Sequence, residues 1–316
     1  MKILITGVAG FIGSNLLDEL LKDGKNTIIG IDNYNDFYDP NIKKNNIKHN
    51  LNNSKFIFYN IDLLDVTSLK QIFEKNNIDG IVHLAGFGGV RPSIDNPKLY
   101  IDQNIVATLN ILECMKNYNV NKLVYASSSS VYGNSNESIF SENLNVSEPI
   151  SPYAMTKKAC EELCYTYHKL YNLNIVALRF FTVYGKRQRP DLAISKFTKL
   201  ILEDKPIPVF GDGTTMRDYT YIDDIVQGII SSVEYNKTSY EIINLGGGEP
   251  INLDRMISTI ESVLGKKAII NRMDMQKGDV NKTIADINKA RKLLNYNPKT
   301  SFESGIQKFI EWYKNK

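Results

Sequence analysis

The chain has 316 residues, 42% of them hydrophobic, which suffices for one large domain or for two domains that share an interface. Lys and Arg number 38 against 35 acidic residues, and the net charge of +3 excludes the strong positive field typical of nucleic-acid-binding proteins. No stretch of about 18 apolar residues occurs, and three cysteines do not form a disulfide framework. We therefore expect a cytoplasmic protein with no nucleic-acid or membrane partner.

Short β-rich runs alternate with helical patterns in the first part of the chain. Residues 2–6 have the pattern of a buried strand, and a helical pattern follows the next glycine turn. Strand patterns recur at residues 27–32, 55–60, 80–84, 122–127 and 174–179, and helical patterns at 66–76, 99–119 and 152–171. This alternation predicts an α/β fold, a doubly wound parallel sheet (Rossmann-like) with crossover helices.

A glycine-rich turn, with Gly7, Gly10 and Gly13, follows the first predicted strand. Its spacing differs from the usual dinucleotide fingerprint, in which one residue separates the first two glycines. Its context is that of a dinucleotide site, because a helix follows and Asp32 ends the next strand, where its carboxylate can bind an adenosine ribose. That carboxylate would repel a 2′-phosphate, so the sequence favours NAD over NADP.

After about residue 179 the alternation becomes irregular, with loops rich in Gly, Pro and Asp. Helical patterns remain at residues 193–203, 223–235, 252–264 and 302–314, and short strand patterns at 241–244 and 268–273. We expect residues 1–179 to form the NAD-binding domain. Residues 180–316 should mainly form a smaller mixed α/β domain for the substrate, with some segments returning to the first domain.

Tyr153 and Lys157 form a candidate catalytic pair. Pro152 suits the first turn of a helix, and a Tyr and a Lys four residues apart lie on one helix face. An ammonium beside a phenol stabilises the phenolate, which can then take a proton from a substrate. This spacing is common in ordinary helices, so its meaning depends on the glycine turn and on the hydroxyl run of residues 127–130.

Further motifs occur in the order expected of one enzyme family. They are Thr6-Gly7-x-x-Gly10-x-x-Gly13, Asp32, Asp62, Ala85-Gly86, Asn104, Ser127-Ser128-Ser129-Ser130 before Val131-Tyr132-Gly133, and Tyr153-x-x-x-Lys157. With these motifs the chain resembles the extended short-chain dehydrogenase/reductases, and within them the nucleotide-sugar 4-epimerases. The turn at residues 32–39 and the stretch from Arg179 to Asp191, with Thr182 where UDP-glucose epimerases carry Asn, are most similar to the UDP-glucuronate 4-epimerases.

The resemblance implies a tightly bound NAD, a UDP-sugar substrate and no metal. It implies that Tyr153, Lys157 and Ser128 are catalytic. It implies cofactor contacts from Gly7, Gly10, Phe11, Ile12, Gly13, Asp32, Asn33, Asp62, Leu63, Leu84, Ala85, Gly86, Asn104, Tyr153 and Lys157. It implies substrate contacts from Arg91, Ser128, Ser129, Ser130, Thr182, Arg189, Val209, Arg217 and Asp279.

The implied reaction is reversible oxidation at C4 of the sugar, rotation of the 4-keto intermediate and reduction from the opposite face. Related dehydratases carry an Asp-Glu pair near the position of Ser129 and Ser130, and hydroxyl donors there suit a uronate carboxylate instead. Thr283 stands where a bulky aromatic would exclude N-acetyl sugars, so UDP-N-acetylglucosamine and UDP-glucose remain alternative substrates. A dehydratase, a decarboxylase and a non-catalytic dinucleotide sensor are further alternatives.

Two other features concern surfaces and loops. The helical patterns at 99–119 and 152–171 carry apolar residues on more than one face, and the resemblance implies that they pair in a homodimer. Cys160, Cys164 and His168 are too far apart along a helix to share one metal, so we expect them in the core or an interface. For Arg187 and Arg189, the sequence is compatible with a solvated position or with a substrate contact.

Overall fold

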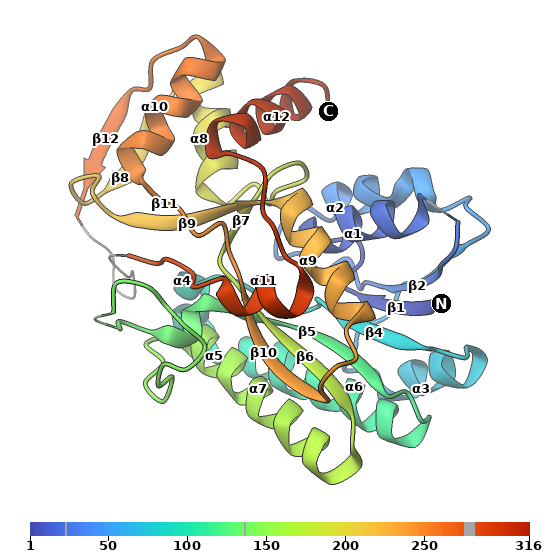
Figure 1. Cartoon of the computed structure of the whole chain (residues 1–316). Coiled ribbons are helices and arrows are strands. Elements are labelled where there is room, and N and C mark those ends of the chain that lie inside the picture. Colours follow the sequence, from blue (N-terminus) through green and yellow to red (C-terminus); the bar gives the residue numbers. More distant parts are fainter. Residues whose placement is uncertain (23, 136, 275–281) are drawn as a thin grey trace.

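The computed structural model describes residues 1–316 except 23, 136 and 275–281, and it contains one large parallel sheet (Figure 1). The strand order is β10-β6-β5-β4-β1-β2-β3, and every neighbouring pair is parallel. The strands are β1 (Lys2–Thr6), β2 (Thr27–Ile31), β3 (Phe56–Tyr59), β4 (Gly80–His83), β5 (Lys122–Ser128), β6 (Asn174–Phe180) and β10 (Tyr240–Leu245). The predicted doubly wound sheet is confirmed.

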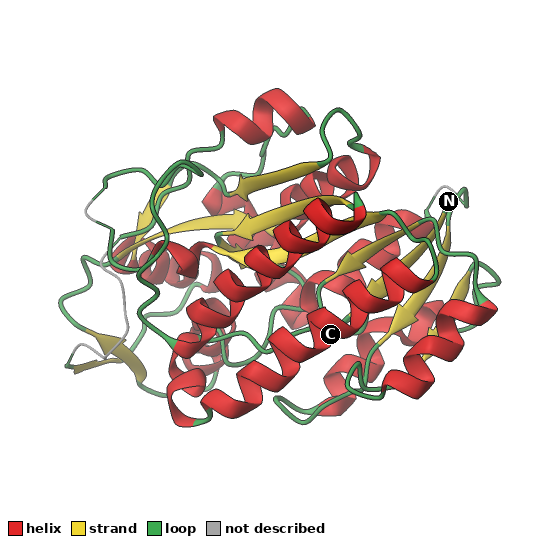
Figure 2. Ribbon diagram, turned by 90° about the horizontal axis from the view of Figure 1, so that it is seen from below, coloured by secondary structure: helices red, strands yellow, loops and turns green. Residues whose placement is uncertain are grey.

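Helices cover both faces of this sheet, as Figure 2 shows. Alternate strand residues point to opposite faces, so Ile3 and Ile5 pack into one apolar core and Leu4 into the other. The first core includes residues of α1 (Phe11–Leu21), α9 (Ile222–Glu234) and α11 (Asn288–Leu294). The second includes residues of α3 (Val66–Lys75), α6 (Ala107–Asn117) and α7 (Pro152–Tyr171). Because both faces are buried, the strands have nearly continuous apolar sequences.

A smaller part of the chain lies above the large sheet in the view of Figure 1. It contains a three-stranded sheet of β7 (Thr182–Tyr184), β9 (Met216–Tyr221) and β11 (Pro250–Asn252), and a parallel pair of β8 (Ile207–Phe210) and β12 (Ile270–Met273). Its helices are α8 (Ala193–Leu202), α10 (Leu253–Leu264) and α12 (Phe302–Lys314). Strand β10 and helix α9 come from this half of the sequence and pack in the large α/β layer.

The structure differs from the predicted elements in two ways. The helix expected at 99–119 is divided into α5 (Pro97–Tyr100), a π-helical stretch η2 (Ile101–Val106) and α6. Several short elements were not predicted, because each has only a few residues or a mixed polar pattern. They are β7, β8, β9, β11, α2 (Pro40–Ile47), η1 (Lys48–Asn50), α4 (Val90–Asp95), η3 (Ser129–Tyr132) and α11. Among the described residues, no helix combines the length and apolarity needed to cross a membrane.

A buried ion pair joins β5, β6 and α7 beneath the carboxyl end of the sheet. The Nε and Nη2 atoms of Arg179 donate to the two carboxylate oxygens of Glu161 at 2.9 and 2.8 Å, and Ser127 Oγ donates to Glu161 Oε1 at 2.6 Å. Burial alone would lower the pKa of Arg179, but the Glu161 carboxylate more than offsets this and holds that pKa above its usual range. The pair thus fixes the end of β5 against the middle of α7.

Replacing Glu161 by Gln should lower the free energy of unfolding by about 3 kcal/mol, because Arg179 is then a buried charge without its counter-ion. Denaturant unfolding monitored by circular dichroism measures this change. Glu162→Gln is the matched control, since Glu162 is exposed on the same helix and pairs only with Lys158 among the described contacts. Equal effects of the two substitutions would contradict the assigned importance of the buried pair.

Candidate active site

A cavity of about 500 Å³ opens at the carboxyl ends of the parallel strands, where α/β sheets commonly bind ligands. It brings together many residues that the sequence singled out. Those lining it are Gly7, Gly10, Phe11, Ile12, Gly13, Asp32, Asn33, Leu63, Leu84, Ala85, Gly86, Ser128, Ser129, Ser130, Tyr153, Lys157, Thr182 and Arg189. Residues from both halves of the sequence therefore meet in one space.

The glycine turn between β1 and α1 forms the floor of one end of the cavity. A Cβ atom on Gly13 would lie 2.2 Å from the carbonyl oxygen of Gly7, and one on Gly7 would lie 2.8 Å from the backbone nitrogen of Ala85. The first turn of α1 carries no acidic side chain and no side-chain cap, so its N–H groups can bind an anion. This cradle fits the diphosphate of NAD.

Asp32 follows β2 at the edge of this cradle. Its carboxylate accepts hydrogen bonds from the backbone N–H groups of Ala9 at 3.1 Å and Tyr34 at 2.9 Å. Burial raises the pKa of Asp32, and the bond from Tyr34, the charge of Lys43 and the bond from Ala9 oppose that shift. The two backbone bonds hold the carboxylate in one orientation at the cavity wall, as a ribose acceptor requires.

Helix α7 presents Tyr153 and Lys157 to the cavity. The helix begins after Ser151, whose Oγ accepts from the N–H of Ala154 at 3.1 Å, and Pro152 occupies its first turn. The Nζ atom of Lys157 donates to the carbonyl oxygen of Ala126 at 2.8 Å, which anchors the ammonium at the end of β5. The cavity wall therefore has a phenol and an ammonium from one face of the helix.

The serine run lies opposite this helix, where β5 ends and η3 begins. Ser128 Oγ accepts from the backbone N–H of Ser130 and donates to Ser130 Oγ, both at 3.1 Å. Ser129 and Thr182 also line the cavity, and Thr182 begins β7, two residues after β6 ends at Phe180. The result is a wall of hydroxyl groups, and no carboxylate stands at positions 129 and 130.

Other predicted site residues do not line the cavity. Asn104 is buried and holds Phe87 through two hydrogen bonds, one from Phe87 N to Oδ1 at 2.7 Å and one from Nδ2 to Phe87 O at 3.1 Å. Asp62 accepts from Asn33 Nδ2 at 2.8 Å, next to lining residue Leu63. Both side chains position segments of the cavity wall.

The remaining predicted substrate contacts come from the smaller part of the chain or from α4. Arg91 places its guanidinium 4.7 Å from the ring centre of Phe210, and Arg217 Nη1 donates to Met216 O at 2.9 Å. Val209 is fully buried in β8. Asp279 lies outside the described residues.

Sequence reasoning missed the cavity residues that follow Asp32. Phe37, Tyr38 and Lys43 also line the cavity. Lys43 donates to Asn35 Oδ1 at 2.7 Å, and burial lowers its pKa while the charge of Asp32 opposes that shift. No usable sequence signal marks Lys43, because Lys44 stands beside it and no apolar periodicity shows which face of α2 is buried.

A chain of hydrogen bonds passes under the cofactor end of the cavity through buried His83. Thr108 Oγ1 donates to Asn104 O at 2.6 Å, so it accepts from His83 Nε2 at 3.0 Å, and His83 Nδ1 accepts from Thr6 Oγ1 at 2.6 Å. Thr6 Oγ1 in turn accepts from the backbone N–H of lining residue Ala85 at 3.2 Å. A neutral imidazole with its proton on Nε2 satisfies all of these bonds.

The stability of the protein should fall with decreasing pH because of His83. Burial, with a smaller contribution from the charge of Lys157, lowers the pKa of His83 to about 3 from an ordinary value of 6.5. Between these values only the unfolded chain binds the proton, so the free energy of unfolding should fall by roughly 1.4 kcal/mol per pH unit from this group. Unfolding curves at about pH 6 and pH 4 measure the decline.

The contribution of His83 is isolated by comparing variants. His83→Gln should show a shallower decline of unfolding free energy between about pH 6 and pH 4 than the wild-type protein does. Identical slopes in wild type and His83→Gln would refute the assignment.

Comparisons with known proteins agree with this fold and cavity. The sequence profile of the GDP-mannose 4,6 dehydratase family matches residues 4–309, so the chain belongs to this family of extended short-chain dehydrogenase/reductases. A UDP-glucuronate 4-epimerase of Thermodesulfobacterium geofontis is 49% identical over 98% of this chain and 95% of its own length.

Two solved structures illustrate the range of related enzymes. The UDP-glucuronic acid 4-epimerase of Bacillus cereus, in complex with UDP-glucuronic acid and NAD, is 41% identical with a TM-score of 0.94, over 100% of this chain and 99% of that chain. A UDP-N-acetylglucosamine 4-epimerase of Methanobrevibacter ruminantium is 30% identical with a TM-score of 0.91, over 99% of this chain and 98% of that chain.

Proposed function

We propose that this protein is an NAD-dependent epimerase that interconverts UDP-glucuronate and UDP-galacturonate at C4 of the sugar. The observation that carries the proposal is the meeting of three features in one cavity. These are the glycine cradle of α1, the Tyr153 and Lys157 pair, and the hydroxyl wall that includes Ser128 and Thr182. The names of the similar enzymes of Thermodesulfobacterium geofontis and Bacillus cereus support the same substrate.

The proton chemistry of the reaction is assigned to residues of α7 and β5. NAD, when bound, accepts a hydride from C4 of the sugar and returns it to the opposite face. Tyr153 as a phenolate takes the proton of the 4-hydroxyl group, and Lys157 stabilises the phenolate and bonds the nicotinamide ribose. Ser128 donates a hydrogen bond to the sugar oxygen, which stabilises the 4-keto sugar while it turns within the cavity.

The hydroxyl wall favours a uronate over the other substrates considered. A sugar carboxylate can accept hydrogen bonds from Ser129, Ser130 and Thr182, whereas carboxylate side chains at these positions would repel it. The dehydratase alternative requires an acid and a base to remove water, and positions 129 and 130 carry neither. Thr283 is buried, and its N–H donates to Met216 O at 3.2 Å. Because this side chain is smaller than the aromatic that would exclude N-acetyl sugars, a UDP-N-acetylated sugar is the second candidate substrate.

The remaining site residues have assigned roles in this proposal. Residues 1–179 hold NAD through the cavity residues of α1 and β2 and of the turns that follow β1 and β4, with Asp62 and Asn104 supporting the cofactor path. Residues 180–316 mainly hold the UDP moiety, for which the proposed contacts are Arg189, Val209, Arg217 and Asp279, and Arg91 of α4 contributes a further substrate contact. The cytoplasmic location stays a prediction, and it agrees with the three buried, free cysteines.

Purified protein incubated with UDP-glucuronate should form UDP-galacturonate, and chromatographic separation of the two sugars measures the yield. Tyr153→Phe should reduce turnover by roughly 10³-fold or more, because the phenolate that takes the proton is lost. Tyr165→Phe, an exposed tyrosine on the same helix, is the matched control and should keep wild-type turnover. UDP-glucose and UDP-N-acetylglucosamine are assayed in parallel, and preferential epimerisation of either would reassign the substrate.

We also propose that the protein is a homodimer joined through η2, α6 and α7. The exposed apolar side chains of Ile101, Val106 and Leu170 support this proposal, and Leu170 is 65% exposed. Light scattering should give twice the chain mass of 35.9 kDa. Val106→Glu should weaken the dimer, whereas Ile57→Glu on edge strand β3 should not. A wild-type monomer would rule the assembly out.

A further inference from the structure

The loop between β7 and α8 carries two arginines in different environments. Two consecutive turns shape it, with Gln188 N donating to Gly185 O at 3.0 Å and Leu192 N donating to Arg189 O at 3.2 Å. Within the first of these turns, Arg187 has a φ of +66°, a left-handed conformation that costs energy for a residue with a Cβ. Contacts outside the loop must therefore hold Arg187 in place.

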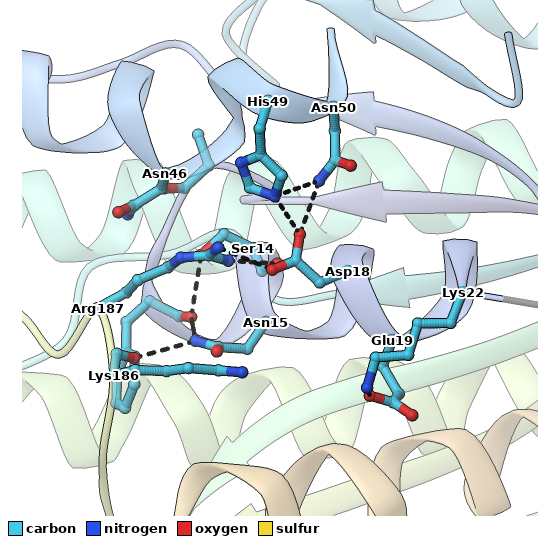
Figure 3. A network of polar contacts seen from close by, with 12 residues as sticks. Ser14, Asn15, Asp18, Glu19, Lys22, Asn46, His49, Asn50, Lys186 and Arg187 are labelled. Carbon is cyan, nitrogen blue, oxygen red and sulfur yellow. Dashed lines mark hydrogen bonds and ion pairs between the residues drawn. The ribbon is translucent and has the colours of Figure 1, made fainter. Parts of the chain in front are cut away.

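Those contacts come from α1, as Figure 3 shows. Arg187 Nη2 lies 2.7 Å from Asp18 Oδ2, and Arg187 Nη1 donates to Ser14 O at 2.9 Å. A second link is the hydrogen bond from Asn15 Nδ2 to Lys186 O at 3.1 Å. The side chain of Arg187 is only 15% exposed and does not line the cavity, so neither environment expected from the sequence applies to it.

Asp18 also joins a third segment to this contact. Its Oδ1 atom accepts from His49 Nε2 at 2.8 Å and from Asn50 Nδ2 at 2.7 Å, and both residues belong to η1 (Figure 3). Both oxygens of the carboxylate are thus used. The first turn of the same helix forms the glycine cradle, so α1 connects the proposed NAD site to the loop of Arg187.

Arg189, two residues further on, does line the cavity. Its guanidinium lies 5.2 Å from the ring centre of Phe37, and its Nη2 donates to Asp191 Oδ2 at 2.9 Å. Its Nη1 atom lies 3.0 Å from the position that a Cβ on Gly88 would occupy. A side chain at position 88 would therefore crowd this guanidinium, and the position of the loop sets where the side chain of Arg189 begins.

We infer that Arg187 is a positioning residue, which acts through Asp18 and the loop to place the guanidinium of Arg189 for binding the nucleotide diphosphate of the substrate. This inference rests on the proposed function. A guanidinium held in advance loses little conformational freedom when it binds an anion, whereas a loose one must be ordered first. Loss of the link between Asp18 and Arg187 therefore weakens diphosphate binding and leaves the groups on α7 in place.

The test is a double-variant comparison of UDP binding to the NAD-loaded protein, measured by titration calorimetry. Arg187→Gln and Arg189→Gln should each raise the Kd for UDP by about fivefold, the usual scale for coupled neighbouring residues. The double variant should bind no more weakly than Arg189→Gln alone. An equal additional loss from Arg187→Gln in the Arg189→Gln background would overturn the inference, as would an unchanged Kd in the single variant.

Two further variants separate positioning from simple stabilisation. Arg187→Lys retains a cation for Asp18 but loses the separate bond to Ser14 O, so its Kd should fall between those of wild type and Arg187→Gln. Lys186→Gln is the matched control, because Lys186 is more exposed and lies 3.8 Å from Asp223, and it should leave the Kd unchanged. A merely structural role would lower the melting temperature of Arg187→Gln without changing the Kd of the folded protein, and this result would contradict positioning.

The proposed function and this inference are tested by different measurements, turnover for the first and UDP binding for the second. UDP binding requires no turnover, so wild-type protein that binds UDP but does not convert UDP-glucuronate contradicts the proposed substrate alone. The Kd for NAD should change less than twofold in Arg187→Gln, because the cradle depends on backbone packing at Gly7 and Gly13. A comparable loss of NAD and UDP affinity would show that α1 itself is displaced and would overturn the inference.

Discussion

The buried pair of Glu161 and Arg179 is the interaction on which the geometry of the cavity depends. Glu161 lies one turn after Lys157 on α7, and it accepts a hydrogen bond from Ser127, the residue before Ser128. The same carboxylate therefore sets the distance between the helix with the phenol and ammonium and the strand with the hydroxyl groups. Two charges removed from water are tolerated because two well-directed hydrogen bonds join them. The Arg179 guanidinium also lies 4.8 Å from the ring centre of Tyr132, although its buried Nη1 atom has no hydrogen-bond partner among the described residues. A looser contact at this place would leave both walls of the cavity free to shift.

The cofactor end of the cavity is built by a different principle, the close approach of backbone segments. Gly7 and Gly13 allow β1, α1 and the end of β4 to pack without intervening side chains, which leaves N–H groups directed at the cavity. Buried polar side chains then hold this backbone in place through hydrogen bonds, such as those of His83 with Thr6 and Thr108. Rigid support suits a cofactor that stays bound, whereas the substrate end uses loops whose position depends on longer-range contacts.

Much of the fold could be predicted because its signals are local and periodic. Helix α7 begins at Pro152 and ends at Tyr171 as expected, and the six strands predicted in the first part of the chain agree with the structure to within one residue at either end. Among the described short strands of the smaller part, β12 overlaps the strand pattern at 268–273, whereas β7, β8, β9 and β11 gave no such signal. Strand β9, for example, contains Arg217 and buried Asp218, whose carboxylate is satisfied by backbone N–H groups distant in the sequence, such as those of Gly247 and Ala285. The direction of the Arg187 side chain could not be predicted from the sequence either. The left-handed backbone at Arg187 directs this side chain toward α1, and no sequence motif indicates that backbone conformation.

The return of β10 to the large sheet has a consequence for how the chain folds during synthesis. Its six residues pair with β6, although about 60 residues separate the two strands in the sequence. Until β10 leaves the ribosome, β6 is an open parallel edge that could pair with another nascent chain. The cavity residues of the first half are all made by then, but the sheet that supports them is incomplete. Protection of this edge by a chaperone would matter most in that interval, well before the last helix, α12, is made.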